Sequence, residues 1–517
     1  MAKFDFLSPF CGEIVIDGCE KQTVFFIKGS ATFEDVCIQL NSNKRGVKVD
    51  IIASSSLVSH VRLLYEIQYK ETTKMFGDSF ERGYADMEWS NVKNRQMFWY
   101  FFLIDEAQKQ LRSFGVAVQP HSIVSFKIDG DTLIVDIDTQ SGGSGVCLEG
   151  RKLDAATLLY KESQYDVLFD DMKAFMKVMM SNYQRKETQT KIYGFNNWYY
   201  AYGKSSYNQI IKDTLLLEEL TKDISVRPYM VIDDGWSIYD TSGPWKPNKK
   251  FVDMANLAKE IKKHNIIPGI WFRPLKDLSD NLQGCRHPLK PELLDLSCNE
   301  VLQLVKEDVS RFVNWGYELI KFDFVTVDLF LNYGFQMDEN LCEQGWRYKD
   351  NHLTNAELLL NLYKAIRQAA PNAVLIGCNA IPHLCAGIVE INRIGDDTSG
   401  LEWERTKNYG VNSLAFRLIQ NNIFYTIDGD CVGITGKIPW KQNREWLRLL
   451  CLSGSPLFVS INPDVCTPEI KKDLIEAFKI NSVQNNICYP IDWLDNKLPN
   501  KWKIDKSIKS FIWDMKR

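Results

Sequence analysis

The larger part of the chain repeats one pattern, in which short apolar runs alternate with amphipathic stretches of helical period from residue 191 onward. Eight such runs occur, at residues 192–198, 229–236, 266–272, 319–325, 373–379, 389–397, 423–430 and 457–462. Alternating strands and helices produce a parallel sheet, and eight strand–helix units can close that sheet into a barrel. The sequence therefore predicts an α/β fold, a (β/α)8 TIM barrel over residues 185–480, rather than an open doubly wound sheet.

The residues on either side of the barrel have a different texture. Residues 1–160 hold short runs that alternate apolar and polar positions between Gly, Asn and Asp, which is typical of antiparallel strands. We predict an N-terminal antiparallel β-sandwich domain there, followed by a helical linker at residues 161–184, where apolar residues recur at helical spacing. Residues 481–517 are too few for an independent domain, so we predict a short C-terminal β segment.

Charge and the lack of long apolar stretches exclude several classes of function. The 62 basic and 66 acidic residues are interleaved and give a net charge of -4, so we expect no nucleic-acid partner. No stretch reaches the ~20 apolar residues of a membrane span. The first ten residues also lack the apolar run of a signal peptide, which favours a cytoplasmic location and no membrane association.

Metal and cofactor signatures are also missing from the sequence. The 13 cysteines are odd in number without C-x-x-C spacing, and the six histidines are scattered, so neither a disulfide framework nor a metal site is predicted. No glycine-rich phosphate loop opens any of the predicted helices. We therefore expect no cofactor, and the oligomeric state, a homo-oligomer included, stays open.

The residues that close the predicted strands form a candidate site, because the strands of such a barrel end at one mouth. They are rich in carboxylates and aromatic rings: Trp198, Asp233, Asp234, Trp236, Trp271, Arg273, Lys321, Asp323, Cys378, Asn379, Arg393, Asp396, Asp397, Asp428 and Asp430. Crowded carboxylates push their pKa values apart, so that one stays ionised as a nucleophile while another keeps a proton as an acid. Aromatic faces suit the C–H faces of a sugar, and the polar groups suit its hydroxyls. The set favours glycoside hydrolysis on a carbohydrate substrate.

Four segments at these strand ends resemble the α-galactosidase clan of retaining glycosidases, and glycoside hydrolase family 36 in particular. They are residues 194–198 (GFNNW), 231–236 (VIDDGW), 321–323 (KFD) and 393–397 (RIGDD). Their order and their places at strand ends match the family over roughly residues 185–470. The resemblance implies a retaining hydrolase that releases terminal α-linked galactose through a covalent glycosyl-enzyme.

The resemblance also implies roles for individual residues. Asp323 would be the nucleophile and Asp397 the general acid/base, about 5 to 5.5 Å apart as in retaining enzymes. The remaining roles belong to substrate binding: Asp233 and Asp234 would hold the 4- and 6-hydroxyls, Lys321 the 3- and 4-hydroxyls, Arg393 the hydroxyls near C2, and Trp198 part of the pocket wall.

Several alternatives remain open at this point. Cys378 and Asn379 stand where the clan reads the substituent at C2, so an α-N-acetylgalactosaminidase is an alternative. A raffinose or stachyose synthase-like transferase shares the VIDDGW motif, and an inactive sugar-binding relative would keep the same pocket. Asp396 competes with its neighbour Asp397 for the role of acid, although the spacing from Arg393 favours Asp397.

Some of the candidate residues also have structural interpretations. Trp236 and Trp271 would belong either to the mouth or to the barrel core. Asp428 and Asp430 would serve either the site or the capping of a following helix.

Overall fold

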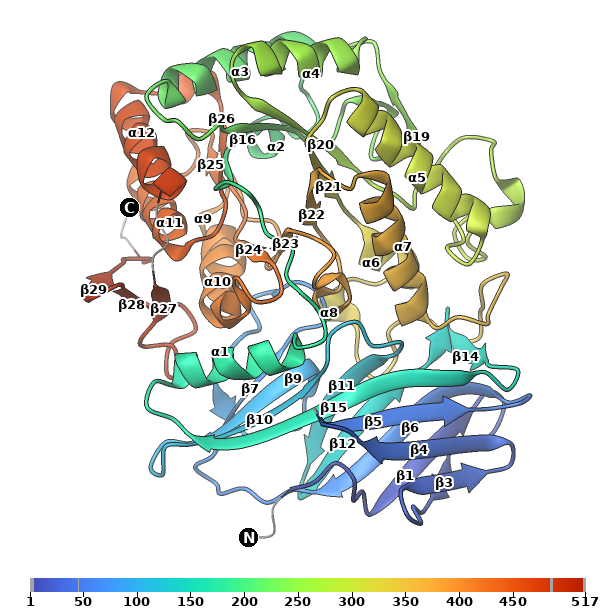
Figure 1. Cartoon of the computed structure of the whole chain (residues 1–517). Helices are drawn as coiled ribbons and strands as arrows, with labels where there is room; N and C mark the ends of the chain where they lie inside the picture. Colours follow the sequence, from blue (N-terminus) through green and yellow to red (C-terminus); the bar gives the residue numbers. More distant parts are fainter. Residues whose placement is uncertain (1–3, 45, 484–486, 515–517) are drawn as a thin grey trace.

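The computed structural model describes residues 4–44, 46–483 and 487–514 (Figure 1). An antiparallel N-terminal sheet lies against one side of a barrel of parallel strands, with helix α1 (Leu168–Met179) between them. The predicted segments 1–160 and 481–517 include residues 1–3, 45, 484–486 and 515–517, which lie outside the described residues.

The N-terminal strands form one strongly curved sheet, with 15 strands among the described residues. Its central path runs β13-β14-β6-β12-β11-β9-β10-β15-β5-β4-β3, and every pairing is antiparallel. The strands are β1 (Cys11–Ile16), β2 (Gln22–Val24), β3 (Ser30–Phe33), β4 (Val36–Ser42), β5 (Val47–Ile52), β6 (Leu57–Glu66), β7 (Lys74–Asp78), β8 (Ser90–Asn91), β9 (Gln96–Asp105), β10 (Gln110–Val116), β11 (Ile123–Asp129), β12 (Thr132–Asp138), β13 (Gln140–Ser141), β14 (Ser144–Cys147) and β15 (Lys152–Gln164).

Strand β9 shows how this sheet is joined to the barrel, because both of its faces are buried. Side chains alternate across a strand, so Phe101 and Leu103 enter the core enclosed by the sheet. Tyr100 and Phe102 point the other way, into a core shared with α1 and the barrel. Helix α1 lies within the segment 161–184 that was predicted as a helical linker, and its apolar face packs on the sheet.

The barrel strands form a parallel sheet, with nine strands in the described part of the chain, in the order β24-β23-β22-β21-β20-β17-β16-β26-β25. They are β16 (Tyr193–Asn196), β17 (Tyr229–Ile232), β20 (Ile267–Phe272), β21 (Leu319–Phe322), β22 (Val374–Gly377), β23 (Ile391–Arg393), β24 (Thr426–Asp428), β25 (Val432–Ile434) and β26 (Leu457–Ile461). Each of the eight predicted runs contains one of these strands. The ninth strand, β25, lies outside the predicted runs.

Closure of the barrel depends on the segment that carries β24 and β25. Its first half pairs with β23 and its second half with β26, so the chain itself joins the two edges of the sheet at residues 429–431. When β24 and β25 are counted as one bent strand, the barrel has eight strands among the described residues. The predicted (β/α)8 barrel is therefore confirmed.

The helices cover the outside of the barrel (Figure 1). They are α2 (Trp198–Ala201), α3 (Tyr207–Thr221), α4 (Met254–Lys263), α5 (Asn299–Asn314), α6 (Val325–Phe330), α7 (Asn355–Ala369), α8 (Pro382–Cys385), α9 (Trp403–Arg405), α10 (Asn412–Arg417), α11 (Trp440–Ser453) and α12 (Pro468–Val483), with the short η1 (Gln283–Cys285), η2 (Gly334–Gln336), η3 (Thr406–Val411), η4 (Leu418–Gln420) and η5 (Pro463–Val465). Ordinary capping begins several of them: Thr354 and Glu357 form a capping box on α7.

Two smaller sheets complete the fold. A hairpin of β18 (Ser237–Tyr239) and β19 (Ser242–Pro247) follows β17. Near the C-terminus, β27 (Cys488–Pro490), β28 (Lys501–Ile504) and β29 (Ser507–Ser510) form the predicted short β extension. The Tyr489 ring of this extension stacks on Phe169 of α1 with ring centroids 4.9 Å apart. None of the helices within the described residues combines the length and apolar character needed to cross a membrane.

Candidate active site

A pocket of about 340 Å³ lies at the carboxyl ends of the barrel strands. Its lining combines carboxylates, cations and aromatic rings: Arg82, Tyr84, Trp198, Asp233, Asp234, Thr241, Trp271, Lys321, Asp323, Phe324, Tyr333, Phe335, Asn379, Asp396 and Asp397. Eight residues that the sequence singled out for catalysis or substrate binding are therefore brought to one cavity: Trp198, Asp233, Asp234, Trp271, Lys321, Asp323, Asn379 and Asp397.

One part of the pocket is a network of hydrogen bonds and an ion pair around Asp233. Lys321 Nζ lies 2.8 Å from Asp233 Oδ2, and Asn196 Nδ2 donates to the same oxygen at 2.7 Å. Burial alone would lower the pKa of Lys321, but the attraction of the acidic groups around it, Asp233 above all, outweighs that effect and raises the pKa. Lys321 is thus held in its charged form beside Asp233, and the two side chains are pre-organised for hydrogen bonds to a polar ligand.

Asp234 is held differently from its neighbour Asp233. Its Oδ1 accepts a hydrogen bond from the backbone N–H of Gly235 at 2.7 Å. Burial and the nearby Asp233 charge raise the pKa of Asp234 to about 6. This side chain can therefore accept, or when protonated donate, a hydrogen bond near neutral pH.

Asp323 stands directly after β21, the fourth strand of the barrel. Trp271 Nε1 donates to its Oδ2 at 3.1 Å, and the backbone N–H of Phe324 donates to its Oδ1 at 2.7 Å. Phe324 has a φ of 62°, a left-handed conformation that is unfavourable for a bulky residue and turns the chain sharply after the carboxylate. The two donors fix the direction of the Asp323 carboxylate at the cavity.

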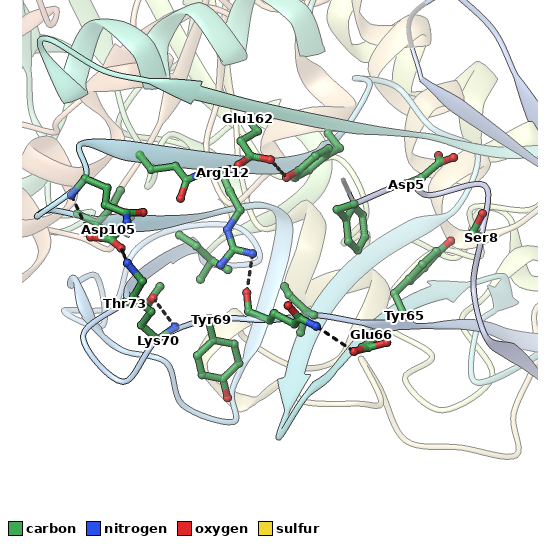
Figure 2. Close-up of a pocket in the computed structure, with 18 of the residues that line it drawn as sticks. Asp5, Ser8, Tyr65, Glu66, Tyr69, Lys70, Thr73, Asp105, Arg112 and Glu162 are labelled. Atoms are coloured by element: carbon green, nitrogen blue, oxygen red, sulfur yellow. Dashed lines mark hydrogen bonds and ion pairs between the residues drawn. The ribbon is translucent and has the colours of Figure 1, made fainter. Parts of the chain in front are cut away.

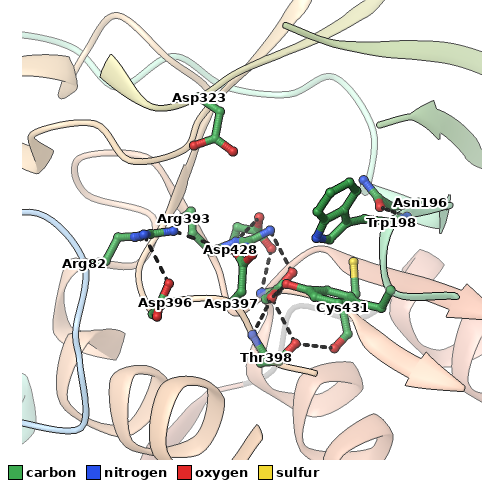
Figure 3. Close-up of polar contacts among 12 residues, drawn as sticks. Arg82, Asn196, Trp198, Asp323, Arg393, Asp396, Asp397, Thr398, Asp428 and Cys431 are labelled. Carbon is green, nitrogen blue, oxygen red and sulfur yellow. Dashed lines mark hydrogen bonds and ion pairs between the residues drawn. The ribbon is translucent and has the colours of Figure 1, made fainter. Parts of the chain in front are cut away.

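Asp397 follows β23, the sixth strand of the barrel, and its side chain is 40% exposed. Arg393 Nη1 lies 3.4 Å and Arg82 Nη1 3.8 Å from its Oδ1. Burial raises the pKa of Asp397, but the guanidinium groups of Arg82 and Arg393 outweigh that effect and hold the pKa below its usual value. In Figure 3 the carboxylate of Asp323 points toward the group of side chains around Arg393 and Asp397.

Asp396, the neighbour of Asp397, is tied more tightly. Arg82 Nη2 lies 3.1 Å from one of its oxygens, and Arg405 Nη2 lies 3.5 Å from the other. An acid that must approach a substrate needs an oxygen free of such pairing. The geometry thus favours Asp397 over Asp396 for that role.

Arg393 lies behind the pocket surface, 4% exposed. Its Nε lies 3.0 Å from Asp428 Oδ2, and its Nη2 lies 2.7 Å from Asp430 Oδ1. Asp430 also accepts from the backbone N–H of Thr398 at 2.8 Å. Asp428 and Asp430 therefore serve as counter-ions that fix Arg393, and their oxygens are not used to cap a helix.

Three other predicted residues do not line the cavity. Cys378 is 1% exposed, behind the wall, as Arg393 is. Trp236 belongs to the core: it is 0% exposed, donates through Nε1 to the carbonyl oxygen of Trp271 at 2.9 Å, and packs against Trp245. Of the two interpretations of Trp236, the structure supports the core one and corrects its assignment to substrate binding. The reason is its position directly before β18, where Trp245 of the hairpin β18–β19 packs on it.

Sequence reasoning did not identify the residues that the N-terminal domain contributes to the pocket. The loop after β7 carries Glu81, Arg82 and Tyr84. Its backbone is bonded to the segment before the predicted acid: Gly83 N–H donates to Ile394 O at 2.9 Å, and Asp396 N–H donates to Gly83 O at 3.0 Å. The adjacent charged residues Glu81 and Arg82, in a loop between two strands, were the available signal of a functional contact. Nothing in the sequence of this loop indicates which surface of the barrel it contacts.

Groups that could hold a metal ion lie elsewhere. Among the described residues two clusters bring three such side chains together, Cys147 with Glu149 and His352, and Cys285 with Cys298 and Glu300. Neither cluster includes a residue of the barrel pocket.

A second hollow, of about 740 Å³, lies on the N-terminal sheet beside strands β6, β9, β10 and β15 (Figure 2). Its polar groups are already bonded to one another: Arg112 donates to the carbonyl of Gln68 at 2.7 Å, and Tyr160 donates to Glu162 at 2.9 Å. The opposed pair of strand-end carboxylates is a feature of the barrel pocket, which we therefore take as the candidate active site.

No protein-family model matches the chain. Its structure is similar to that of TtGalA, an alpha-galactosidase from Thermus thermophilus in complex with p-nitrophenyl alpha-D-galactopyranoside, with a TM-score of 0.62 at 17% identity over 92% of this chain and 96% of that one. It is also similar to a variant of the GH36 alpha-galactosidase AgaA from Geobacillus stearothermophilus in complex with 1-deoxygalactonojirimycin (TM-score 0.60, 14% identity, 94% and 71% covered).

An alpha-galactosidase from Lactobacillus brevis gives a TM-score of 0.57 at 14% identity, covering 96% of this chain and 72% of that one. Agreement extends through the N-terminal sheet as well as the barrel, since more than nine-tenths of this chain is matched in each case. The chain thus has the fold of the glycoside hydrolase family 36 alpha-galactosidases.

Proposed function

We propose that the protein is a retaining glycoside hydrolase that releases terminal α-linked galactose. The observation that carries the proposal is that Asp323 and Asp397, which follow the fourth and sixth barrel strands, line the same cavity. Two carboxylates that can both reach one anomeric carbon are the catalytic groups that a double-displacement mechanism requires.

In the first step, a carboxylate oxygen of Asp323 attacks C1 of the sugar. The bond from C1 to the glycosidic oxygen breaks, and that oxygen takes the proton of Asp397 as the leaving group departs. In the second step, Asp397 removes a proton from water while the water oxygen attacks C1 and releases Asp323. Two inversions at C1 return the α configuration.

The rest of the pocket has the donors and acceptors that such a sugar requires. Asp233, Asp234 and Lys321 would bind hydroxyls, because they present fixed charged or polar groups with known partners. Trp198 lines the same cavity with an indole ring, which offers an apolar face to the sugar ring. Galactosides in complexes of proteins with this fold support the choice of substrate.

The test is to assay aryl α-galactoside, α-N-acetylgalactosaminide and β-L-arabinopyranoside in parallel, for the wild type and Asp323→Ala. We expect the galactoside to be the best substrate and the variant to lose about three orders of magnitude or more in kcat, as when a nucleophile is removed. Added azide should restore turnover of the activated galactoside by Asp323→Ala with a β-configured galactosyl azide, because a single inversion then occurs.

Lys437→Ala, an exposed residue after β25, is the matched control and should behave as the wild type. Full activity of Asp323→Ala would refute the assignment. Measuring the products with and without an added sugar acceptor separates hydrolysis from transfer to a second sugar.

A further inference from the structure

Three aromatic rings line the pocket next to its catalytic carboxylates. Tyr84 comes from the N-terminal loop, whereas Tyr333 and Phe335 come from the segment after α6. Tyr333 and Phe335 stack with centroids 5.8 Å and planes 6° apart, and Tyr84 meets Phe335 edge-on at 4.9 Å. Phe335 is 64% exposed, which is unusual for a phenylalanine held in a packed cluster. We call these three rings the aromatic edge.

Arg82 connects the Tyr84 end of the aromatic edge to Asp397. The guanidinium of Arg82 lies 5.6 Å from the centroid of the Tyr84 ring and donates to the Tyr84 hydroxyl at 3.4 Å. The same guanidinium pairs with Asp396 at 3.1 Å and lies 3.8 Å from Asp397. The chain of contacts from Asp397 through Arg82 to Tyr84 is therefore short.

A buried carboxylate holds the aromatic edge in place. Glu81, 0% exposed, accepts a hydrogen bond from the Tyr84 hydroxyl and one from the backbone N–H of Gly334 at 3.2 Å. Its second oxygen accepts from Asn379 Nδ2 at 2.7 Å. A side chain at position 334 would have its Cβ 2.8 Å from Glu81 Cγ, so only glycine permits this approach. One residue of the N-terminal domain thus positions rings from both parts of the molecule.

The chemistry of the proposed reaction says what the edge can bind. Asp397 gives its proton to the glycosidic oxygen, so the departing group must stand beside Asp397. We infer that the aromatic edge is the binding surface for the leaving group, and that it takes a group with a flat apolar face, a second pyranose ring or an aryl ring. Rigid aromatic faces bind such groups by apolar contact. This inference rests on the proposed function.

The test compares substrates with and without an extended leaving group. Raffinose and p-nitrophenyl α-galactoside carry one, whereas α-galactosyl fluoride releases only fluoride. In Phe335→Ala we expect kcat/KM for raffinose and the aryl galactoside to fall about tenfold, since an apolar contact on the departing group is lost. The value for α-galactosyl fluoride should stay within about twofold of the wild type.

Two further variants sharpen the comparison. Phe335→Trp keeps a flat ring and should retain the wild-type preference for extended leaving groups. Phe25→Ala removes a phenylalanine that is 70% exposed on the N-terminal sheet, outside the pocket lining, and should leave the kinetics with all three substrates unchanged.

The outcomes separate the two claims. Wild-type protein that does not turn over α-galactosyl fluoride would contradict the proposed function, and with it this inference. Where the wild type does hydrolyse the fluoride, an equal fall for all substrates in Phe335→Ala, or no fall for raffinose and the aryl galactoside, overturns the role of the aromatic edge alone.

Discussion

At the scale of single residues, the neighbours Asp396 and Asp397 show what sequence could and could not predict. Both close the sixth apolar run, and the spacing from Arg393 favoured Asp397. The physical difference is their pairing: Asp396 is held by Arg82 and Arg405, whereas Asp397 keeps a partly exposed side chain with longer contacts. Arg82 lies more than 300 residues earlier in the chain, so no local pattern could reveal that difference.

Arg82 also affects the titration of the proposed acid. Its positive charge, with that of Arg393, holds the pKa of Asp397 below its usual value against the effect of burial. The acid works in its protonated form, so kcat/KM falls as the pH rises through that pKa. Removing the charge in Arg82→Gln should raise the pKa of Asp397 and move the alkaline limb of the kcat/KM profile to higher pH.

The measurement is a pH profile with aryl α-galactoside for the wild type, Arg82→Gln and Lys437→Gln. The last variant removes an exposed positive charge from the segment after β25, and its alkaline limb should stay where the wild type has it. An alkaline limb in Arg82→Gln that stays in place or moves to lower pH would show that Arg82 does not act on Asp397.

At the scale of elements, periodicity located the barrel strands but not the way the barrel closes. The seventh run was predicted at residues 423–430, whereas the structure divides the strand into β24 and β25. Asp430 adopts a φ of 78° between them and is held there by Thr398 and Tyr199. A bend fixed by long-range hydrogen bonds leaves no trace in an apolar pattern, because the residues on both sides remain buried.

Two tryptophans of the strand ends show the same limit. Trp236 and Trp271 close neighbouring apolar runs and look equivalent in sequence. Trp271 reaches the cavity and donates to Asp323, whereas Trp236 packs against Trp245 and Phe312. The distinction depends on the hairpin β18–β19, whose packing the alternation of apolar residues does not specify.

At the scale of the whole molecule, the N-terminal sheet is part of the candidate site. Sequence predicted that sheet from its alternating runs, but the contact of its loop with the barrel mouth depends on how two parts of the chain dock. Arg417 of α10 is central to that docking: its Nε lies 2.8 Å from Asp78 Oδ1, and its Nη1 donates to the carbonyl oxygens of Glu81 and Ile394 at 2.6 and 2.7 Å. Arg417 and Asp78 side chains are both 0% exposed.

Replacing Arg417 should therefore damage stability and activity together. In Arg417→Met, the buried Asp78 loses its cationic partner, which should lower the free energy of unfolding by about 3–5 kcal/mol. The loop that carries Arg82 also loses its anchor, so kcat/KM should fall. Denaturant unfolding and the aryl α-galactoside assay check both effects. The control is Arg444→Met, which removes the more exposed arginine of the Arg444–Asp473 ion pair and should change the free energy of unfolding by only about 0–1 kcal/mol. A stable, fully active Arg417→Met would contradict this role.

Identifying the residue that forms the covalent intermediate would decide whether Asp323 is the nucleophile. A fluorinated α-galactosyl fluoride whose glycosyl-enzyme hydrolyses slowly should be incubated with the protein, followed by proteolysis and mass spectrometry of the labelled peptide. We expect one galactosyl adduct per chain, on Asp323, and none in Asp323→Ala. An adduct on another residue, or turnover of α-galactosides with no adduct formed, would be incompatible with the proposed mechanism.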